Sequence, residues 1–224
     1  MICCWIQLLM KYRPSIAKEI TLWSLDVYKI HIKEWPTVKD KILSLVPWDD
    51  INQRKNPEAR ENLDDAPHEM TWTDYYLQGG ESLDCYEMAS HGIDLRSCVD
   101  HIDYEVAFFS IISPYIRLFL NQSDFKFTEV SKCWAQRYSK GDYHPPHDHG
   151  SEGYAAVFYA ELDPKEHRST EFMQPWIPTN GNRDMCSVEG AVEGDLIIFP
   201  SNLYHMAPPH YSDKYRTIIS FNLS

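Results

Sequence analysis

Four short runs of β-branched and aromatic residues fill the C-terminal part of the chain from about Lys126 onward. They are separated by glycine, proline and asparagine turns, with no helical pattern between them, which is typical of a β-sandwich or β-barrel. One run is apolar at consecutive positions, as expected for a strand that is covered on both faces. The runs are FTEVSKCWAQRY, GYAAVFYAEL, GDLIIFP and YRTIISFNL.

The upstream part begins with a strand pattern followed by a helical pattern. Residues 22–34 alternate apolar and polar side chains with one slip near Tyr28, which predicts an entry strand with a bulge. Pro36 then suits the first turn of a helix. The apolar residues on one face of that helix are Val38, Ile42 and Leu45.

A second helical pattern follows the polar, charged residues 49–70, which we interpret as a surface excursion. Pro114 lies inside this second pattern and should kink or break the helix, because proline removes an interior hydrogen bond. The apolar face of the helix comprises Ile102, Val106, Phe109, Ile116 and Leu120.

A chain of 224 residues is long enough for one well-cored domain. We predict a single domain over residues 1–224, mainly β with flanking helices. Residues 1–125 would supply an N-terminal strand and helices that pack on a barrel formed by residues 126–224.

Composition excludes some function classes. The formal net charge of −12 disfavours sequence-independent binding of nucleic acid, which needs a basic surface. The apolar run Met1–Met10 is about half as long as a membrane-spanning helix and lacks the flanks of a signal peptide. We therefore expect a cytoplasmic protein with no membrane segment and with reduced thiols, because the cysteines form no dense framework. A structural zinc knuckle is not expected either, because no cysteine pair has CxxC spacing. The cysteines are Cys3, Cys4, Cys85, Cys98, Cys133 and Cys186.

The segment HPPHDHG carries the first chemical signal. On an extended chain, residues two apart face the same side, so His147 and His149 can face one ion while Asp148 points away. Imidazole nitrogen suits Fe(II), Zn or Cu. We expect the flanking His144 and His210 to be surface histidines. Residues predicted to be ordinary surface or satisfied core histidines are His31, His68, His91, His101 and His167.

A second element makes the HxH pair more informative. His205 follows the strand GDLIIFP in a loop from which it can reach the first pair, and Arg216 opens the last strand. An arginine inside an apolar barrel needs an anionic partner, and a dicarboxylate ligand can pair with guanidinium in bidentate fashion. The alternative is a salt bridge from Arg216 to one of the protein's own carboxylates.

Together, HPPHDHG, His205 in GDLIIFPSNLYHMAPP and Arg216 in RTIISFN resemble the 2-oxoglutarate/Fe(II)-dependent oxygenase superfamily. The resemblance is greatest to small oxygenases of tailed phages, which are related to prolyl hydroxylases. GDYHPPHDHG is also similar to the aspartyl/asparaginyl β-hydroxylases. The resemblance covers roughly Phe127 to Leu223 and implies a double-stranded β-helix, a jelly-roll fold like that of the cupins.

The resemblance implies an Fe(II) site of the form HxD/E…H. Here His149 stands at the acidic position, and three outcomes are open: His149 binds the metal, water replaces it, or Asp148 reaches the metal. We predict the ligands His147, His149 and His205, because the spacing of two residues favours His149 over Asp148. An HxD string at His101–Asp103 lies in the helical region, where residues two apart do not share a face.

By the same resemblance, the distal carboxylate of 2-oxoglutarate pairs with Arg216. Many relatives have serine two residues later, where this chain has Ile218. Tyr159 and Tyr138 are candidates to replace its hydroxyl, although core packing is the commoner role of such tyrosines. Other residues that could line the site are Asn222, which shares a strand face with Arg216, and Trp134 and Trp176.

The activity implied is hydroxylation of a prolyl-type peptide residue or a small molecule by dioxygen, with decarboxylation of 2-oxoglutarate to succinate. One alternative is a cupin-type dioxygenase with three histidines and no 2-oxoglutarate. Another is a non-enzymatic jelly-roll protein whose metal site is closed by a fourth ligand such as His144 or His210.

Overall fold

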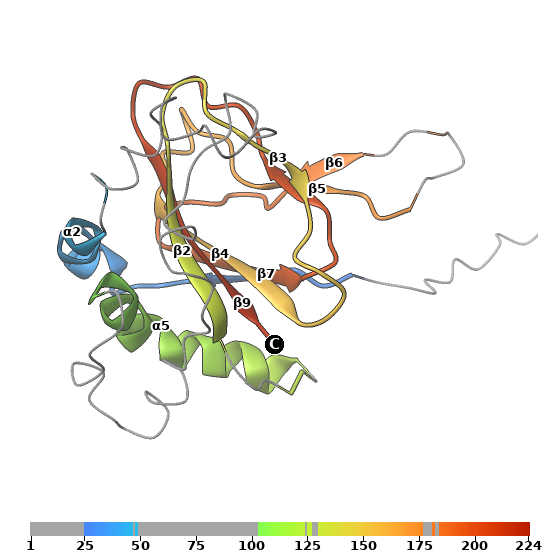
Figure 1. The fold of residues 1–224 in the computed structure, drawn as a ribbon, viewed down its shortest axis with the longest axis horizontal. Coiled ribbons are helices and arrows are strands. Elements are labelled where there is room, and N and C mark those ends of the chain that lie inside the picture. The colour runs from blue at the N-terminus through green and yellow to red at the C-terminus, as the bar shows by residue number, and fades with distance from the viewer. Residues whose placement is uncertain are drawn as a thin grey trace, which may run out of the picture.

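The computed structural model describes residues 25–46, 48, 103–123, 125–126, 130–176, 181 and 184–224. Within these residues two helices accompany two antiparallel sheets (Figure 1). The elements are β1 (Tyr28–His31), α2 (Trp35–Leu45), α5 (Asp103–Gln122), β2 (Val130–Tyr138), β3 (His144–His147), β4 (Tyr154–Glu161), β5 (Glu171–Met173), β6 (Met185–Ser187), β7 (Asp195–Pro200), β8 (His205–Ala207) and β9 (Arg216–Leu223).

The strands form a five-stranded sheet in the order β1-β7-β4-β9-β2 and a four-stranded sheet in the order β3-β8-β5-β6. The four C-terminal strands predicted from the sequence are β2, β4, β7 and β9, and they lie together with the predicted entry strand, β1, in the larger sheet. Side chains from both sheets meet in one apolar cluster, so the sheets pack face to face. The fold is the predicted double-stranded β-helix.

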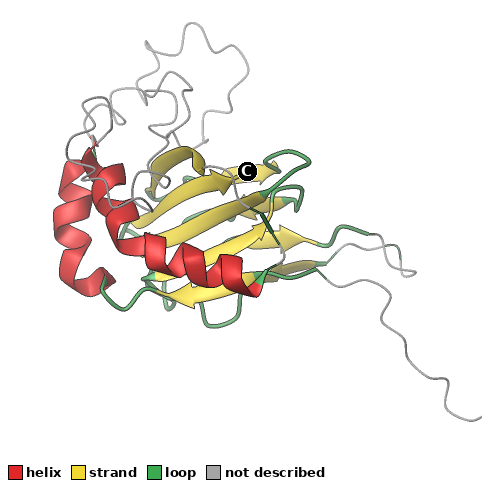
Figure 2. Cartoon of the chain, turned by 90° about the horizontal axis from the view of Figure 1, so that it is seen from below, coloured by secondary structure: helices red, strands yellow, loops and turns green. Residues whose placement is uncertain are grey.

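Strand β4 shows why its sequence is apolar at every position. Ala156 and Phe158 belong to an outer core, whereas Ala155, Val157 and Tyr159 belong to the inner core between the sheets. Residues of α2 and α5 complete the outer core, and Figure 2 shows the helices on one side of the larger sheet. Both faces of β4 are therefore covered, as predicted.

Two local predictions about the upstream part are corrected and a third is narrowed. Strand β1 pairs with β7 in regular register from Tyr28 to His31, without the expected bulge. In α2 the inward residue near the C-terminal end is Leu43, whereas Leu45 is exposed. Helix α5 includes Pro114, so of the kink or break expected there the break is ruled out. Packing of neighbouring α5 side chains into the outer core stabilises the helix despite the missing hydrogen bond.

Several predictions concern residues outside the described part of the chain, among them the excursion at 49–70, the His101–Asp103 string, His68 and His91. The division of the chain at residue 125 also stays a prediction. Of the cysteines that the structure describes, neither Cys133 nor Cys186 forms a disulfide. Neither described helix is long and apolar enough to cross a membrane.

Gly153, which precedes β4, gives a test of the packing. Its φ is +79°, and a Cβ atom there would overlap the backbone carbonyl oxygen of Leu223 on β9. We expect Gly153→Ala to lower the free energy of unfolding by about 2–4 kcal/mol, through backbone strain and the clash together. The matched control is Gly141→Ala, where φ is +93° and no atom lies within 4 Å of the added methyl. If urea denaturation showed the same loss of unfolding free energy in Gly153→Ala and Gly141→Ala, the close approach of β9 to Gly153 would be contradicted.

Candidate metal centre

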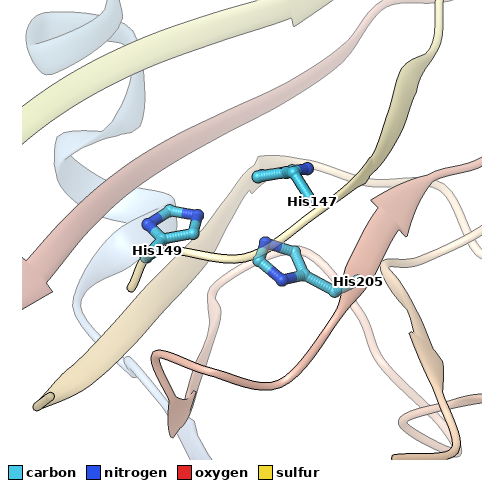
Figure 3. Close-up of side chains that lie close together, drawn as sticks. All are labelled: His147, His149 and His205. Carbon is cyan, nitrogen blue, oxygen red and sulfur yellow. The ribbon is translucent and has the colours of Figure 1, made fainter. Parts of the chain in front are cut away.

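Three histidines converge where β3 meets β8 (Figure 3). His147 at the end of β3 lies opposite His205 at the start of β8, and their ring centroids are 4.3 Å apart. His149 follows two residues after His147, and its ring lies 5.0 Å from that of His205. One ligand atom from each of the three side chains lies within 4.8 Å of the others. The predicted residues are therefore brought together.

The hydrogen bonds of these imidazoles fix the nitrogen that each presents. In every case Nδ1 faces a carbonyl oxygen: that of Pro145 at 2.9 Å for His147, that of Leu203 at 2.9 Å for His205, and the side-chain Oδ1 of Asn222 at 2.6 Å for His149. Because only a protonated Nδ1 can donate to oxygen, the lone pair is on Nε2. All three rings thus have the tautomer that binds a metal through Nε2, as in sites where a second hydrogen bond orients the ligand.

Burial keeps the imidazoles of His147 and His205 neutral. It lowers the pKa of His205 to about 2 and also lowers the pKa of His147. A metal must displace protons from protonated imidazole, so neutral rings at neutral pH are ready to bind. The donor set, three imidazole nitrogens of intermediate softness, fits Fe(II), Zn or Cu.

Asp148 is not part of the cluster. Its side chain is exposed, and its Oδ1 accepts a hydrogen bond from the backbone N–H of Gly150 at 3.1 Å. The ring of His149 instead points inward and stacks on Trp134, with 5.6 Å between the centroids. Of the three arrangements considered from the sequence, this geometry favours His149 as the third ligand.

Asn222 orients His149. The sequence indicated that Asn222 shares a strand face with Arg216, but it did not identify His149 as the residue that Asn222 contacts. We expect Asn222→Leu to weaken Co(II) or Fe(II) binding by about 10- to 100-fold, because outer hydrogen-bond partners of ligating histidines contribute that much. Asn222→Asp keeps an acceptor for the Nδ1–H and should retain most of the affinity. Calorimetric titration with Co(II) measures both variants. Unchanged affinity in Asn222→Leu would show that His149 does not bind the metal.

Arg216 lies on the inner face of β9 with 2% of its surface exposed. Its guanidinium carbon is 4.1 Å from the centroid of the Tyr138 ring, and Nη1 donates to the carbonyl oxygen of Arg168 at 2.7 Å. Within the described chain, Nε has no hydrogen-bond partner and no carboxylate forms an ion pair with this arginine. The internal salt bridge considered from the sequence is therefore absent there. An unpaired buried guanidinium fits a ligand carboxylate.

The two predicted tyrosines lie beside Arg216, at its end of the barrel. Burial raises the pKa of Tyr138 to about 12 and raises that of Tyr159, while the Arg216 charge opposes both shifts. Both phenols are therefore neutral at neutral pH. The Tyr159 oxygen accepts from the backbone N–H of Thr170 at 2.9 Å, which leaves its proton to be donated elsewhere. Ile218, in the place of the usual serine, belongs to the inner core.

The two flanking histidines are not surface residues, contrary to expectation. His144 is half-buried against His147, and the signal for this was the Pro145-Pro146 pair, which interrupts the strand ladder. His210 is buried and its Nε2 donates to the backbone oxygen of Lys214 at 2.6 Å. Neither joins the cluster of ligand atoms in the described chain, so no fourth side chain closes the site.

Comparison with known families supports this assignment. Residues 132–222 match a family described as "Putative 2OG-Fe(II) oxygenase". The resemblance to 2OG-Fe(II) oxygenases is confirmed. The match includes the three clustered histidines and Arg216, and it excludes the N-terminal helices. None of the curated proteins matches the sequence.

Solved structures of such oxygenases have the same fold. A Trichoplax adhaerens prolyl hydroxylase, solved with a peptide of hypoxia inducible factor, is 11% identical over 89% of this chain and 84% of its own, with a TM-score of 0.52. The α-ketoglutarate-dependent carbocyclase SnoK of nogalamycin biosynthesis is 12% identical over 87% and 79%, with a TM-score of 0.50. A Pseudomonas putida prolyl-4-hydroxylase is 14% identical over 89% and 92%, with a TM-score of 0.49. At these identities the likeness concerns the fold.

Proposed function

We propose that the protein is an Fe(II)- and 2-oxoglutarate-dependent dioxygenase that hydroxylates its substrate. The observation that carries the proposal is the inner face of β9. This face holds the unpaired Arg216 at one end and, at the other, the Asn222 that orients His149. One strand therefore joins an anion site to a metal site, as binding of a metal-chelating dicarboxylate requires.

In this proposal each residue has a defined task. His147, His149 and His205 would hold iron through Nε2, and no fourth side chain of the described chain joins their cluster. Arg216 binds the distal carboxylate of 2-oxoglutarate, and the neutral phenols of Tyr138 and Tyr159 can add hydrogen bonds to it. Bound iron would supply the oxygen chemistry that couples decarboxylation of 2-oxoglutarate to hydroxylation.

For the substrate, we propose a prolyl-type peptide residue or a small molecule. The fold that this chain shares with a prolyl hydroxylase solved with a peptide supports the former. SnoK, which is similar in fold to the same extent, supports the latter. Since one fold serves many substrates, the likeness guides only the choice of first assays.

A second candidate is a three-histidine dioxygenase of the cupin type that uses no 2-oxoglutarate. The all-histidine donor set favours it, because the oxygenases that this chain resembles contribute a carboxylate at the position of His149. In that case Arg216 would bind a carboxylate of the substrate itself. The two candidates differ in whether 2-oxoglutarate is consumed.

Turnover of 2-oxoglutarate tests the proposal without knowledge of the substrate. The protein is incubated aerobically with Fe(II), ascorbate and 2-oxoglutarate labelled at C1. Carbon dioxide is measured by its label and succinate, which does not retain C1, is measured separately. We expect slow turnover that requires iron and is lost in Arg216→Met, and acceleration by a proline-containing peptide would identify a substrate class. Oxygen consumption with a thiol carboxylate but not with 2-oxoglutarate would favour the second candidate.

A further inference from the structure

His144 lies beside the three clustered histidines, with its ring centroid 4.2 Å from that of His147. These two residues are three apart, a spacing that puts side chains on opposite faces of a regular strand. The pairing of β3 with β8 shifts register between them, since His144 lies opposite Ala207 and His147 opposite His205. Ala207 and His205 are two apart and share a face, so this β-bulge turns both imidazoles inward.

The hydrogen bonding of His144 is the reverse of that in the three clustered histidines. The amide Nε2 of Gln136, a β2 residue with 3% of its surface exposed, donates to Nδ1 of His144 at 3.2 Å. An accepting Nδ1 places the proton on Nε2. Whereas the clustered rings each present a lone pair at Nε2, His144 presents an N–H donor.

His144 also lies toward Arg216. Gln136 is two residues before Tyr138, whose ring packs under the Arg216 guanidinium, and the two share the inner face of β2. A ligand that extends from the metal site to Arg216 would therefore pass His144 at its metal end.

We propose that His144 binds the 2-oxo acid end of 2-oxoglutarate by donating its Nε2–H to the C1 carboxylate, and that Gln136 is the positioning residue that fixes the required tautomer. The inference rests on the proposed function, because it assumes that 2-oxoglutarate spans the two sites. It adds a binding residue that the HxH…H and arginine pattern does not contain.

Calorimetry on the Co(II)-loaded full-length protein tests this, with 2-oxoglutarate and oxalate as probes. Oxalate has the chelating end of the cosubstrate but cannot reach Arg216. We expect His144→Phe to weaken both probes by about 10- to 100-fold, the effect of losing a hydrogen bond to a charged group. Arg216→Met, the matched control, should weaken 2-oxoglutarate and leave oxalate unchanged. Co(II) affinity should be the same in all these proteins.

A spectroscopic measurement addresses Gln136 and does not depend on the folding of the His144 variant. Imidazole ¹⁵N shifts report the tautomer, and we expect the Nε2–H form of His144 in the parent. In Gln136→Met we expect a mixture of tautomers and a several-fold loss of oxalate affinity. A pure Nδ1–H form of His144 in the parent would overturn the proposal.

The outcomes separate the inference from the function on which it rests. If the Co(II)-loaded parent does not bind 2-oxoglutarate, the proposed function fails. If the parent binds 2-oxoglutarate and His144→Phe binds both probes as tightly as the parent does, only the role of His144 is overturned. Loss of Co(II) affinity in His144→Phe would also overturn it, because His144 would then be a metal ligand.

Discussion

Replacement of His205 by alanine is expected to abolish metal binding at stoichiometric concentrations of Fe(II) or Co(II). His205 is the most enclosed of the three clustered histidines, with 4% of its surface exposed, and it supplies one of the three nitrogens that cluster within the described residues. Loss of an orienting partner alone costs 10- to 100-fold in metal affinity, so loss of a ligand should exceed about 100-fold. Calorimetric titration and metal content after gel filtration measure the effect.

The matched control is a histidine outside the cluster. His31 on β1 is half-exposed and its Nδ1 pairs with Asp195 at 2.8 Å, so His31→Ala removes an imidazole without changing the donor set. We expect its metal affinity to equal that of the parent. Full metal binding by His205→Ala would show that the ions bind elsewhere.

Replacement of Arg216 by methionine is expected to abolish tight binding of 2-oxoglutarate without lowering the thermal stability. Removal of one partner of a buried charge pair costs about 2–5 kcal/mol, which corresponds to roughly 30- to several thousandfold in affinity. The ligand-free protein should tolerate the change, since burying an unpaired charge is unfavourable and methionine of similar length removes that cost.

Arg137 provides the control for Arg216. It is adjacent to Tyr138 on β2 but pairs with Glu161 at 3.3 Å and stacks on Trp48, so its guanidinium already has protein partners. Arg137→Met should keep the 2-oxoglutarate affinity and lose stability, the reverse of Arg216→Met. If Arg216→Met binds 2-oxoglutarate as the parent does, Arg216 is not the cosubstrate anchor.

The sequence was sufficient to predict the larger sheet and the clustered histidines. Strands such as β4 and β7 are long enough for their apolar pattern to be read, and the HxH spacing places two imidazoles on one side of an extended chain. The smaller sheet was harder to predict, because β5, β6 and β8 have three residues each and their pairing depends on contacts distant in sequence.

The parts of the site that escaped prediction depend on register. The two prolines that follow His144 cannot donate to a strand ladder and so indicate an interruption, but the inward direction of the ring depends on the register of β3 against β8. Likewise, Asn222 meets His149 only because β9 places its last residues beside the loop after β3. Such contacts follow from the tertiary arrangement rather than from hydrophobic periodicity.

The most direct test is an anaerobic titration of the Fe(II)-loaded protein with 2-oxoglutarate, followed by visible absorption. Chelation of iron by the 2-oxo acid gives a weak charge-transfer band. We predict that the band develops with one equivalent of 2-oxoglutarate in the parent, shifts to much higher concentrations in Arg216→Met, and is absent in His205→Ala. An iron-replete parent that shows no band at saturating 2-oxoglutarate would contradict the assignment of this fold to a 2-oxoglutarate-dependent enzyme.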